Sequence, residues 1–477
     1  MKNKQILPDR TVDMSSWYHE VIARAELAEH APVKGCMVIR PYGYAIWELI
    51  QSALDKRIKD QGASNAYFPM FIPESFLARE KTHIDGFAPE IAVVTHAGGE
   101  RLQEPLVVRP TSETIVHDSM ARWIDSYRDL PLRINQWSNV VRWENRPRLF
   151  LRNTEFLWQE GHTAHATEEE ARREVADIVT LYHDFVAEVL AMPTICGVKS
   201  EKEKFAGAVE SHSIEGLMPD GKGLQMGTIH YLEENFSRMA KVMFLDSDGE
   251  HKFVHMTSWG VSTRLIGGLI MIHGDARGLV LPPVVAPTQV VIVPIVTKEE
   301  REFVMSRVAI VAQQLRDHGL RVQIDDREGV RPGVKFYHHE MRGVPLRIEI
   351  GPRDAKQDMV MCAWRFSGVK ESLHMDALET ISHKLTEVQC AMLEKASVDL
   401  TERTISVHKR NEFIVRLKAQ DGFISAGWCG SQECEQNIKE ATGATTRNMP
   451  YEYAQKGETC VWCGDPAVTT VLFAKAY

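Results

Sequence analysis

Four cysteines near the C-terminus have the spacing of a metal site. Cys429 and Cys434 are separated by four residues, Cys460 and Cys463 by two, and 25 residues lie between the pairs. Two such pairs are typical of a Zn²⁺ ion held by four thiolates. Because four thiolates leave no open coordination position, the predicted zinc ion is structural. Two disulfides, or a site that has lost its metal, are the alternatives.

A second group of residues could bind an anionic ligand. Arg142 and Glu144 flank Trp143 after an apolar run, and Arg152 and Arg264 follow later in the chain. Positioned arginines neutralise phosphates and stabilise the charge that builds on phosphorus during group transfer. An Arg-x-Glu triplet is also common by chance, and surface Arg–Glu pairs are frequent. The triplet therefore indicates a nucleotide site only together with its context.

A third group alternates along a predicted strand. Trp158, Glu160 and His162 are spaced by two residues, which places their side chains on one face of a strand. Taken alone, a core aromatic residue and a structural histidine are the more common explanations of this pattern.

The whole sequence is that of a multidomain folded protein. Its 477 residues exceed what one core usually holds, so two or three domains are expected. The apolar fraction of 44% and the charged fraction of 25% are ordinary. We expect no membrane span, no signal peptide and a cytoplasmic location. The net charge of −9 argues weakly against a nucleic-acid partner, but a local basic face can offset it.

The elements that must position these groups can be predicted from periodicity. Residues 14–62 are expected to be mostly helical, 64–73 a strand, and 93–114 a hairpin followed by a helix. Strands are predicted over 132–144 and 149–165, and a strand and a helix near 253–273. A helix should begin at a capping box of Thr167 and Glu170, with apolar residues at helical spacing as far as Val189.

The pattern of apolar residues changes after a Pro-rich linker at 279–289. Strands are predicted over 290–296, 321–326, 345–351 and 358–366, and helices over 298–319, 333–343 and 376–396. This alternation predicts a small α/β domain with a largely parallel sheet. The cysteine cluster belongs to a third region, and the domains are predicted as 1–284, 285–402 and 403–477.

Three long stretches resemble the motifs of class II aminoacyl-tRNA synthetases. Residues 39–73, with Pro69, resemble motif 1; residues 133–167 resemble motif 2; and residues 258–283, with Arg264, resemble motif 3. Together with RPTSET (109–114) and FLWQEGHTAHAT (156–167), these stretches make the sequence similar to the prolyl-tRNA synthetase family over almost the whole chain. The resemblance implies an α+β and α/β multidomain fold. Its parts would be an antiparallel-sheet class II catalytic domain, an α/β anticodon-binding domain and a small C-terminal zinc-binding α+β domain.

The resemblance also implies the activity. The protein is expected to activate L-proline with ATP and to transfer proline from the adenylate to the 3′ end of tRNA(Pro). Arg142 and Arg264 would be catalytic, and one or more Mg²⁺ ions would bridge the phosphates. The carboxylate of proline is already ionised, so no general base is required. The residues implied for ATP binding are Arg142, Glu144, Arg152, Thr154, Phe156, Gln225, Thr228 and Arg264.

A proline pocket needs an anion for the amine, a cation for the carboxylate and a flat wall for the ring. The residues assigned to it are Thr111, Glu113, Arg142, Trp158, Glu160, His162, Phe205, His230 and Ser262. Shape alone distinguishes amino acids that differ by one methylene by only about 1–3 kcal/mol. About 115 residues separate Glu144 from Gly260, which is too short for the large editing insertion of the common bacterial form. The chain therefore resembles the shorter archaeal and eukaryotic-like form.

Residues 286–400 resemble the anticodon-binding domain of this synthetase subgroup. Arg347, with Glu340 and Asp354, is the best candidate for base contact, because arginine and carboxylates suit the edges of guanine. A solvated charged surface is the alternative. The motif 1 resemblance implies a homodimer, and the family resemblance implies that Tyr477 folds towards the active site.

Two other functions compete with this one. A class II paralogue could have lost charging and act as a regulatory or nucleic-acid-binding subunit, although such paralogues usually lack motif arginines or the tRNA-reading domain. A zinc-dependent nucleic-acid-binding protein without catalysis is the third possibility, and the complete set of ATP residues argues against it.

Overall fold

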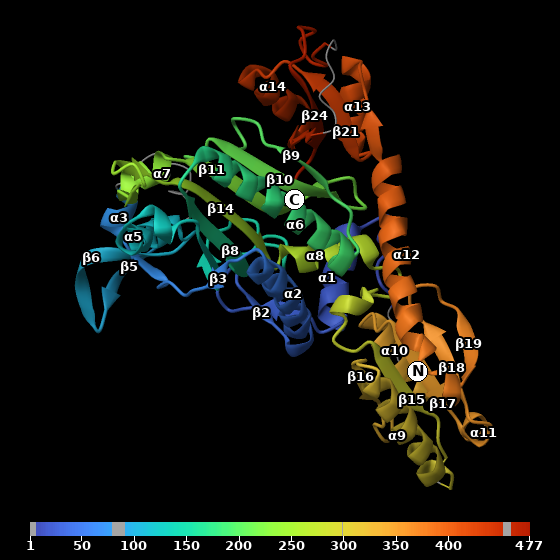
Figure 1. Ribbon diagram of the computed structural model, residues 1–477. Coiled ribbons are helices and arrows are strands. Elements are labelled where there is room, and N and C mark those ends of the chain that lie inside the picture. Colours follow the sequence, from blue (N-terminus) through green and yellow to red (C-terminus); the bar gives the residue numbers. More distant parts are fainter. Residues whose placement is uncertain (1–5, 79–90, 298, 452–458) are drawn as a thin grey trace.

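The computed structural model describes residues 6–78, 91–297, 299–451 and 459–477. A broad central body carries two smaller ones (Figure 1), one formed around β15–β19 and one at the C-terminal end. Among the described helices, none is both long enough and apolar enough to cross a membrane.

An eight-stranded sheet lies at the centre of the large body. Its order is β23-β9-β10-β11-β14-β8-β7-β3, and only the pair β3–β7 is parallel. The strands are β3 (Ser64–Asn65), β7 (Leu132–Val141), β8 (Glu155–His165), β9 (Ile195–Val198), β10 (Glu210–Leu217), β11 (Gly223–Glu233), β14 (His255–Ser262) and β23 (Met449–Pro450). Because β23 comes from the C-terminal part of the chain, that part is built into one edge of the central sheet.

Helices cover one face of this sheet (Figure 1). They are α1 (Met14–Arg24), α2 (Pro41–Asp60), α6 (Glu168–Leu190) and α8 (Arg264–His273). The predicted start of α6 is confirmed, because the Thr167 hydroxyl accepts a hydrogen bond from the Glu170 amide at 3.2 Å. The predicted apolar stripe of α6 is buried as far as Val189. Tyr182 of this helix donates its hydroxyl to Gln159 of β8.

The predicted strands of the central part are shorter than expected. The stretch 132–144 is a strand only as far as Val141. The stretch 64–73 is divided into β3 and β4 (Phe71–Pro73), and the stretch 149–165 is a strand only from Glu155 onwards. The chain cannot continue as a strand through 149–151 because these three apolar residues turn into the core, with Phe150 at φ 62° and Tyr18 bonded to the Leu149 carbonyl at 2.8 Å.

The predicted hairpin is confirmed as β5 (Ala92–Ala97) and β6 (Glu100–Val108). Its turn residues Gly98 and Gly99 both have positive φ, the conformation that a two-residue hairpin turn requires. Nearby elements are α3 (Glu74–Ala78), α5 (Glu113–Trp123), α7 (Asn235–Ala240), β12 (Met243–Leu245) and β13 (His251–Phe253), with β1 (Ala28–His30) and β2 (Met37–Ile39) at the N-terminal side.

The second body is built on the five-stranded sheet β16-β15-β17-β18-β19. Its elements are β15 (Val290–Pro294), α9 (Arg301–Asp317), β16 (Val322–Ile324), α10 (Pro332–Met341), β17 (Leu346–Ile350), α11 (Pro352–Lys356), β18 (Met359–Trp364) and β19 (Lys370–His374). The expectation of a largely parallel sheet is confirmed for β16, β15 and β17, which pair in parallel, and is wrong for β18 and β19, which join in antiparallel fashion. The segments before β18 and β19 are too short to hold the crossover that a parallel strand needs.

The long helix α12 (Thr380–Glu402) connects this body to the C-terminal one (Figure 1). The C-terminal body is the four-stranded sheet β20-β21-β24-β22 with two helices. Its elements are β20 (Thr404–Ser406), α13 (Arg410–Ala419), β21 (Phe423–Trp428), α14 (Gln432–Thr442), β22 (Thr445–Thr446) and β24 (Thr469–Ala474).

Candidate active site

A cavity of about 220 Å³ lies on the face of the central sheet opposite the helices. Trp158, Glu160 and His162 of β8 all line it, as their alternation predicts, while Gln159 between them faces α6. The other lining residues that the sequence predicted are Thr111, Glu113, Arg142, Phe156, Phe205, Gln225, Thr228, His230, Ser262 and Arg264. The structure thus brings together side chains from six separate parts of the chain.

One end of the cavity is acidic. Glu160 is 2% exposed and accepts hydrogen bonds from the Ser112 hydroxyl and, at 2.8 Å, from the Gln136 amide. His162 lies 3.2 Å from the second oxygen of Glu160. Burial lowers the pKa of His162, but the hydrogen bond to Glu160 and the negative charges of Glu160 and Glu113 outweigh it and raise this pKa above its ordinary value. Two carboxylates and a histidine with increased proton affinity therefore face one small volume.

Aromatic rings form the wall next to this acidic end. The rings of Phe205 and His230 are stacked at 4.5 Å. Burial lowers the pKa of His230 to about 3, so this ring is neutral at physiological pH. Its Nδ1 atom lies 2.8 Å from the Ser211 hydroxyl, which holds the ring in place. The indole of Trp158 is fixed in the same way, since its Nε1 donates to the Ser138 hydroxyl at 3.2 Å.

The other end of the cavity is positively charged. The Arg142 guanidinium lies 5.4 Å from the ring centre of Trp158 and 5.7 Å from that of Phe156, and its Nε donates to the Pro110 carbonyl at 2.9 Å. Arg264 donates to the Leu151 and Gln225 carbonyls at 3.0 and 3.4 Å. Burial and neighbouring arginines lower the pKa of Arg264 to about 10, and the group remains cationic at neutral pH. Such a pair favours a multiply charged anion.

Three of the residues predicted for ATP binding lie in the loop beside the cavity rather than in its lining. Glu144 and Arg152 form an ion pair at 2.5 Å, and the Thr154 carbonyl accepts from the Arg142 amide at 2.8 Å. The predicted strands 132–144 and 149–165 would include Arg142 and Arg152. This placement on two paired strands is wrong, because β7 ends at Val141 and β8 begins at Glu155. Both arginines belong to the loop that the buried segment 149–151 anchors.

A β-bulge brings Gln225 and Thr228 to the same side. A spacing of three would place them on opposite faces of a regular strand. In β11, however, Ile214 pairs with Gly227 and Glu215 pairs with Gln225, which leaves Met226 as an extra residue. Gln225 and Thr228 both line the cavity as a result.

Of the three residues predicted to read the anticodon, two line the same cavity and one lies elsewhere. Glu340 and Arg347 line a small cavity of about 100 Å³, where Glu340 pairs with Arg277 at 2.9 Å and Arg347 pairs with Glu349 at 2.9 Å. Asp354 is not in that lining. It caps α11 by accepting from the Gly351 amide at 3.1 Å, beyond the opposite end of β17.

The four C-terminal cysteines converge as their spacing predicts. Their sulfur atoms lie within 4.8 Å of one another, and those of Cys429 and Cys463 are 3.7 Å apart. A tetrahedral Zn²⁺ ion with Zn–S bonds of about 2.3 Å requires sulfur atoms about 3.8 Å apart. All eight cysteines are free, and the 3.7 Å separation is far longer than a disulfide bond of about 2.0 Å. The donor set and its spacing fit zinc.

The C-terminal residue Tyr477 docks on the central body. Its amide donates to the Gly223 carbonyl at 3.2 Å, and its hydroxyl bonds to Asp220. The Arg148 guanidinium lies 5.4 Å from its ring centre, so the tail reaches the loop that carries Arg142 and Arg152.

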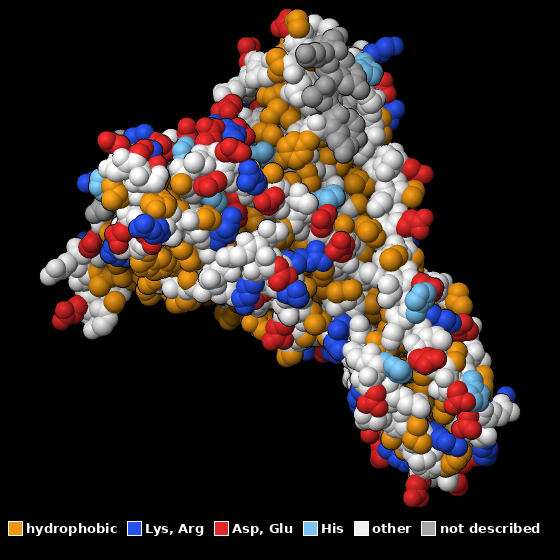
Figure 2. All heavy atoms as spheres, in the orientation of Figure 1, with side chains coloured by type: hydrophobic (Ala, Val, Ile, Leu, Met, Phe, Trp, Pro, Cys, Tyr) orange, Lys and Arg blue, Asp and Glu red, His pale blue; other side chains and the backbone are white. Residues whose placement is uncertain are grey.

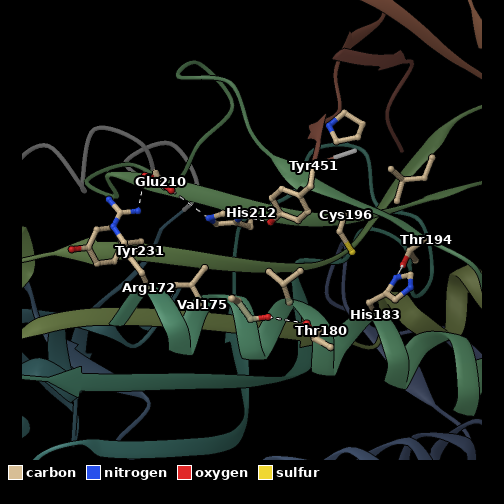
Figure 3. A pocket seen from close by; sticks show the side chains of 14 residues that line it. Arg172, Val175, Thr180, His183, Thr194, Cys196, Glu210, His212, Tyr231 and Tyr451 are labelled. Atoms are coloured by element: carbon tan, nitrogen blue, oxygen red, sulfur yellow. Dashed lines mark hydrogen bonds and ion pairs between the residues drawn. The ribbon is translucent and has the colours of Figure 1, made fainter. Parts of the chain in front are cut away.

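A larger cavity lies on the opposite, helix-covered side of the sheet (Figure 3). It has a volume of about 630 Å³ and is bounded by α6, β9, β10, β11 and the C-terminal residues Pro450 and Tyr451. None of the residues that the sequence predicted for a site lines it. Several of its polar side chains contact one another, as in the pair of Arg172 and Glu210 at 2.9 Å.

Several residues around the site were missed by reasoning from the sequence. Ser112 and Gln136 hold Glu160, and Lys199, Glu215 and Arg447 form a buried charged group behind Gln225. RPTSET contains Ser112, so its polar composition was a usable signal. The others are single polar residues whose neighbours are distant in sequence, and no local pattern marks them.

Comparison with known proteins agrees with this geometry. A proline–tRNA ligase from Symbiobacterium thermophilum is 50% identical over 485 residues, covering 99% of this chain and 98% of the relative. One from Chlorobaculum tepidum is 51% identical over 480 residues, covering 99% of each.

The chain belongs to the proline–tRNA ligase family. Family profiles match three successive segments: the class II tRNA synthetase core domain (G, H, P, S and T) over residues 95–273, the anticodon binding domain over 289–384, and the C-terminal domain of prolyl-tRNA synthetase over 410–477. A crystal structure of prolyl-tRNA synthetase from Cryptosporidium parvum, complexed with halofuginone and AMPPNP, superposes with a TM-score of 0.94. It is 41% identical and covers 99% of both chains.

Proposed function

We propose that this protein activates L-proline with ATP and transfers proline from the adenylate to the 3′ end of tRNA(Pro). The observation that carries the proposal is one cavity with an acidic end and a cationic end, joined at Arg142 and Trp158. Identity of about 50% to proline–tRNA ligases over the full length favours catalysis over a paralogue that has lost charging.

The acidic end suits the secondary ammonium group of proline. Glu113, with the Thr111 hydroxyl donating to it, and Glu160 with His162 supply the negative charge and hydrogen-bond acceptors. The flat apolar ring of proline would lie against the aromatic wall. The residues proposed to form that wall and close the pocket are Trp158, Phe205, His230 and Ser262. Because His230 is neutral, it does not repel the ammonium group.

The cationic end suits the reacting phosphate. A carboxylate oxygen of proline attacks the α-phosphorus of ATP, a new P–O bond forms, and the bond to the β-phosphate breaks so that diphosphate leaves. Both reactants are anions, and Arg142 and Arg264 reduce their repulsion and stabilise the charge on phosphorus. The remaining proposed ATP contacts are Glu144, Arg152, Thr154, Phe156, Gln225 and Thr228. Catalysis then consists of positioning and charge stabilisation, without a general base.

Two metals complete the proposal. Mg²⁺ accompanies ATP, prefers oxygen ligands and keeps several waters; the Glu203 carboxylate lines the cavity and offers such an oxygen. Zn²⁺ would be held by the four cysteines, and its bonds would cross-link the segments around Cys429 and Cys463. The proposed domains are 1–284 for catalysis, 285–402 for the anticodon and 403–477 for the zinc site.

For tRNA we propose base contact through Arg347 and Glu340, which share one cavity. Asp354 remains a prediction, and its capping of α11 argues against it. The anticodon is the part of tRNA(Pro) that such a site would read.

We also propose a cytoplasmic homodimer. Large apolar side chains are exposed near the small sheet β4-β6-β5, among them Tyr67 at 74% and Trp123 at 47%. In Figure 2, hydrophobic side chains gather at the left of the view, where Figure 1 draws α5, β5 and β6. Sedimentation velocity of the wild type and of Tyr67→Asp tests this proposal: a monomeric wild type contradicts it.

Proline-dependent exchange between ATP and labelled diphosphate tests the function. We expect exchange with proline, and Arg142→Ala should reduce its rate by about 100- to 1000-fold. Arg173→Ala, which removes an exposed arginine of α6, is the control and should behave as wild type. Purified wild type without proline-dependent exchange would refute the proposal.

A further inference from the structure

Three buried charged side chains connect the C-terminal body to the proposed ATP site. Arg447 lies between β22 and β23, and its Nη2 and Nε atoms donate to one oxygen of Glu215 at 2.7 and 3.1 Å. The other oxygen of Glu215 lies 3.6 Å from the Lys199 Nζ atom. Lys199 in turn donates to the Gln225 side-chain oxygen at 2.9 Å. The relative exposures of Arg447, Glu215 and Lys199 are 5%, 0% and 8%.

This contact determines which way the Gln225 amide points. A lysine ammonium only donates hydrogen bonds, so the group of Gln225 that faces Lys199 must be its carbonyl oxygen. The amide nitrogen of Gln225 therefore lies on the other side and can donate to a ligand in the cavity, which Gln225 lines. Without Lys199, either end of the amide could face the cavity.

Lys199 itself is held from outside the catalytic part of the chain. Besides Glu215 and Gln225, it lies 3.5 Å from the Arg447 carbonyl. Gly223 leaves room for Arg447, because a Cβ atom there would lie 2.9 Å from the Arg447 Nε atom. Arg447 thus holds Lys199 in two ways: its side chain pairs with Glu215, which lies next to Lys199, and its backbone carbonyl lies against Lys199 itself.

We propose that Arg447 of the C-terminal body is a positioning residue for ATP, acting through Glu215 and Lys199 on the donor side of the Gln225 amide. The inference rests on the proposed contact between Gln225 and ATP. It gives the C-terminal body a part in nucleotide binding in addition to structural support.

Arg447→Met and Lys199→Met test the inference by steady-state exchange. Each variant still leaves one buried cation with Glu215, so no carboxylate becomes unpaired. We expect the KM for ATP to rise about three- to tenfold, the effect of one hydrogen bond, and the KM for proline to change less than twofold. Asn448→Ala is the matched control: it removes a buried contact of the same interface, with the Ile195 carbonyl at 2.9 Å, and should lower the melting temperature without changing the KM for ATP.

Combining Arg447→Met with Gln225→Ala distinguishes an effect transmitted through Gln225 from a general destabilisation of the interface. In the Gln225→Ala background, Arg447→Met should raise the KM for ATP by less than twofold. Independent, multiplicative effects would overturn the inference, as would equal changes in both KM values or an effect of Asn448→Ala like that of Arg447→Met. If Gln225→Ala alone leaves the KM for ATP unchanged, the contact and this inference are wrong, whereas proline activation by the wild type still stands. If one methionine variant fails to fold, the other provides the same test.

Discussion

Gly35 supports the loop that carries Arg142, and its replacement by alanine should disturb that loop. Gly35 is buried, its carbonyl accepts from the Thr154 amide at 2.8 Å, and the Thr154 carbonyl accepts from the Arg142 amide at 2.8 Å. A Cβ atom on Gly35 would lie 2.0 Å from the Thr154 hydroxyl oxygen and 2.9 Å from its Cβ. Thr154 must therefore move, and the backbone of Arg142 moves with it.

The expected magnitude has two parts. At φ +83° an alanine is in the left-handed region, which is unfavourable by about 1–2 kcal/mol. Forcing extra volume into a packed site adds about 1–3 kcal/mol, so the free energy of unfolding should fall by about 2–5 kcal/mol. A displacement of about 1 Å at a reacting group can reduce the rate about 100-fold, so the exchange rate should fall by about that factor.

Gly62→Ala is the matched control for this substitution. Gly62 has φ +88°, and a new Cβ atom there would meet nothing closer than an Arg133 side-chain nitrogen at 4.0 Å. It has the same conformational penalty without the steric contact, so we expect about 1–2 kcal/mol of destabilisation and normal exchange. Urea unfolding and proline-dependent exchange of both variants give the comparison. Equal destabilisation by the two variants, with unchanged exchange in Gly35→Ala, would refute this reasoning.

Three further predictions concern other parts of the molecule. Because the pKa of His162 is raised in the folded protein, its stabilising contribution is fully present below the unfolded pKa of about 6.5 and is lost as pH rises through the folded value. The difference in unfolding free energy between wild type and His162→Gln should therefore shrink as pH rises above about 6.5. A difference that stays constant with pH would contradict this. Cys434→Ser should reduce zinc from about one ion per chain and lower the melting temperature, whereas the exposed Cys390→Ser should keep the metal; metal-free wild type of full stability would disprove the site. Arg347→Ala should slow charging of tRNA about tenfold, the effect of losing a bidentate base contact, while leaving proline-dependent exchange unchanged. Arg316→Ala, on the exposed part of α9, is the control. Equal charging by both variants would show that Arg347 does not contact the anticodon.

Part of the fold could be predicted because its cause is local. The stripe of α6 from Ala171 to Val189 and the common face of Trp158, Glu160 and His162 follow from the periods of helix and strand. The two loop boundaries at Val141 and Glu155 could not be predicted in this way. They depend on the burial of residues 149–151 against α1, which is distant in sequence.

The family, the strand face that lines the cavity and the grouping of the four C-terminal cysteines could be read from the sequence, because they depend on residue type and short spacing. That Gln225 and Thr228 share a side became visible in three dimensions alone, because a bulge at Met226 changes the register of β11 against β10. In the folded chain Asp354 lies apart from Arg347, and Arg447 contacts Glu215 across 232 residues of sequence. Such contacts form where distant segments bury each other's surfaces, and a buried charge is stable only when hydrogen bonds or an opposite charge are buried with it.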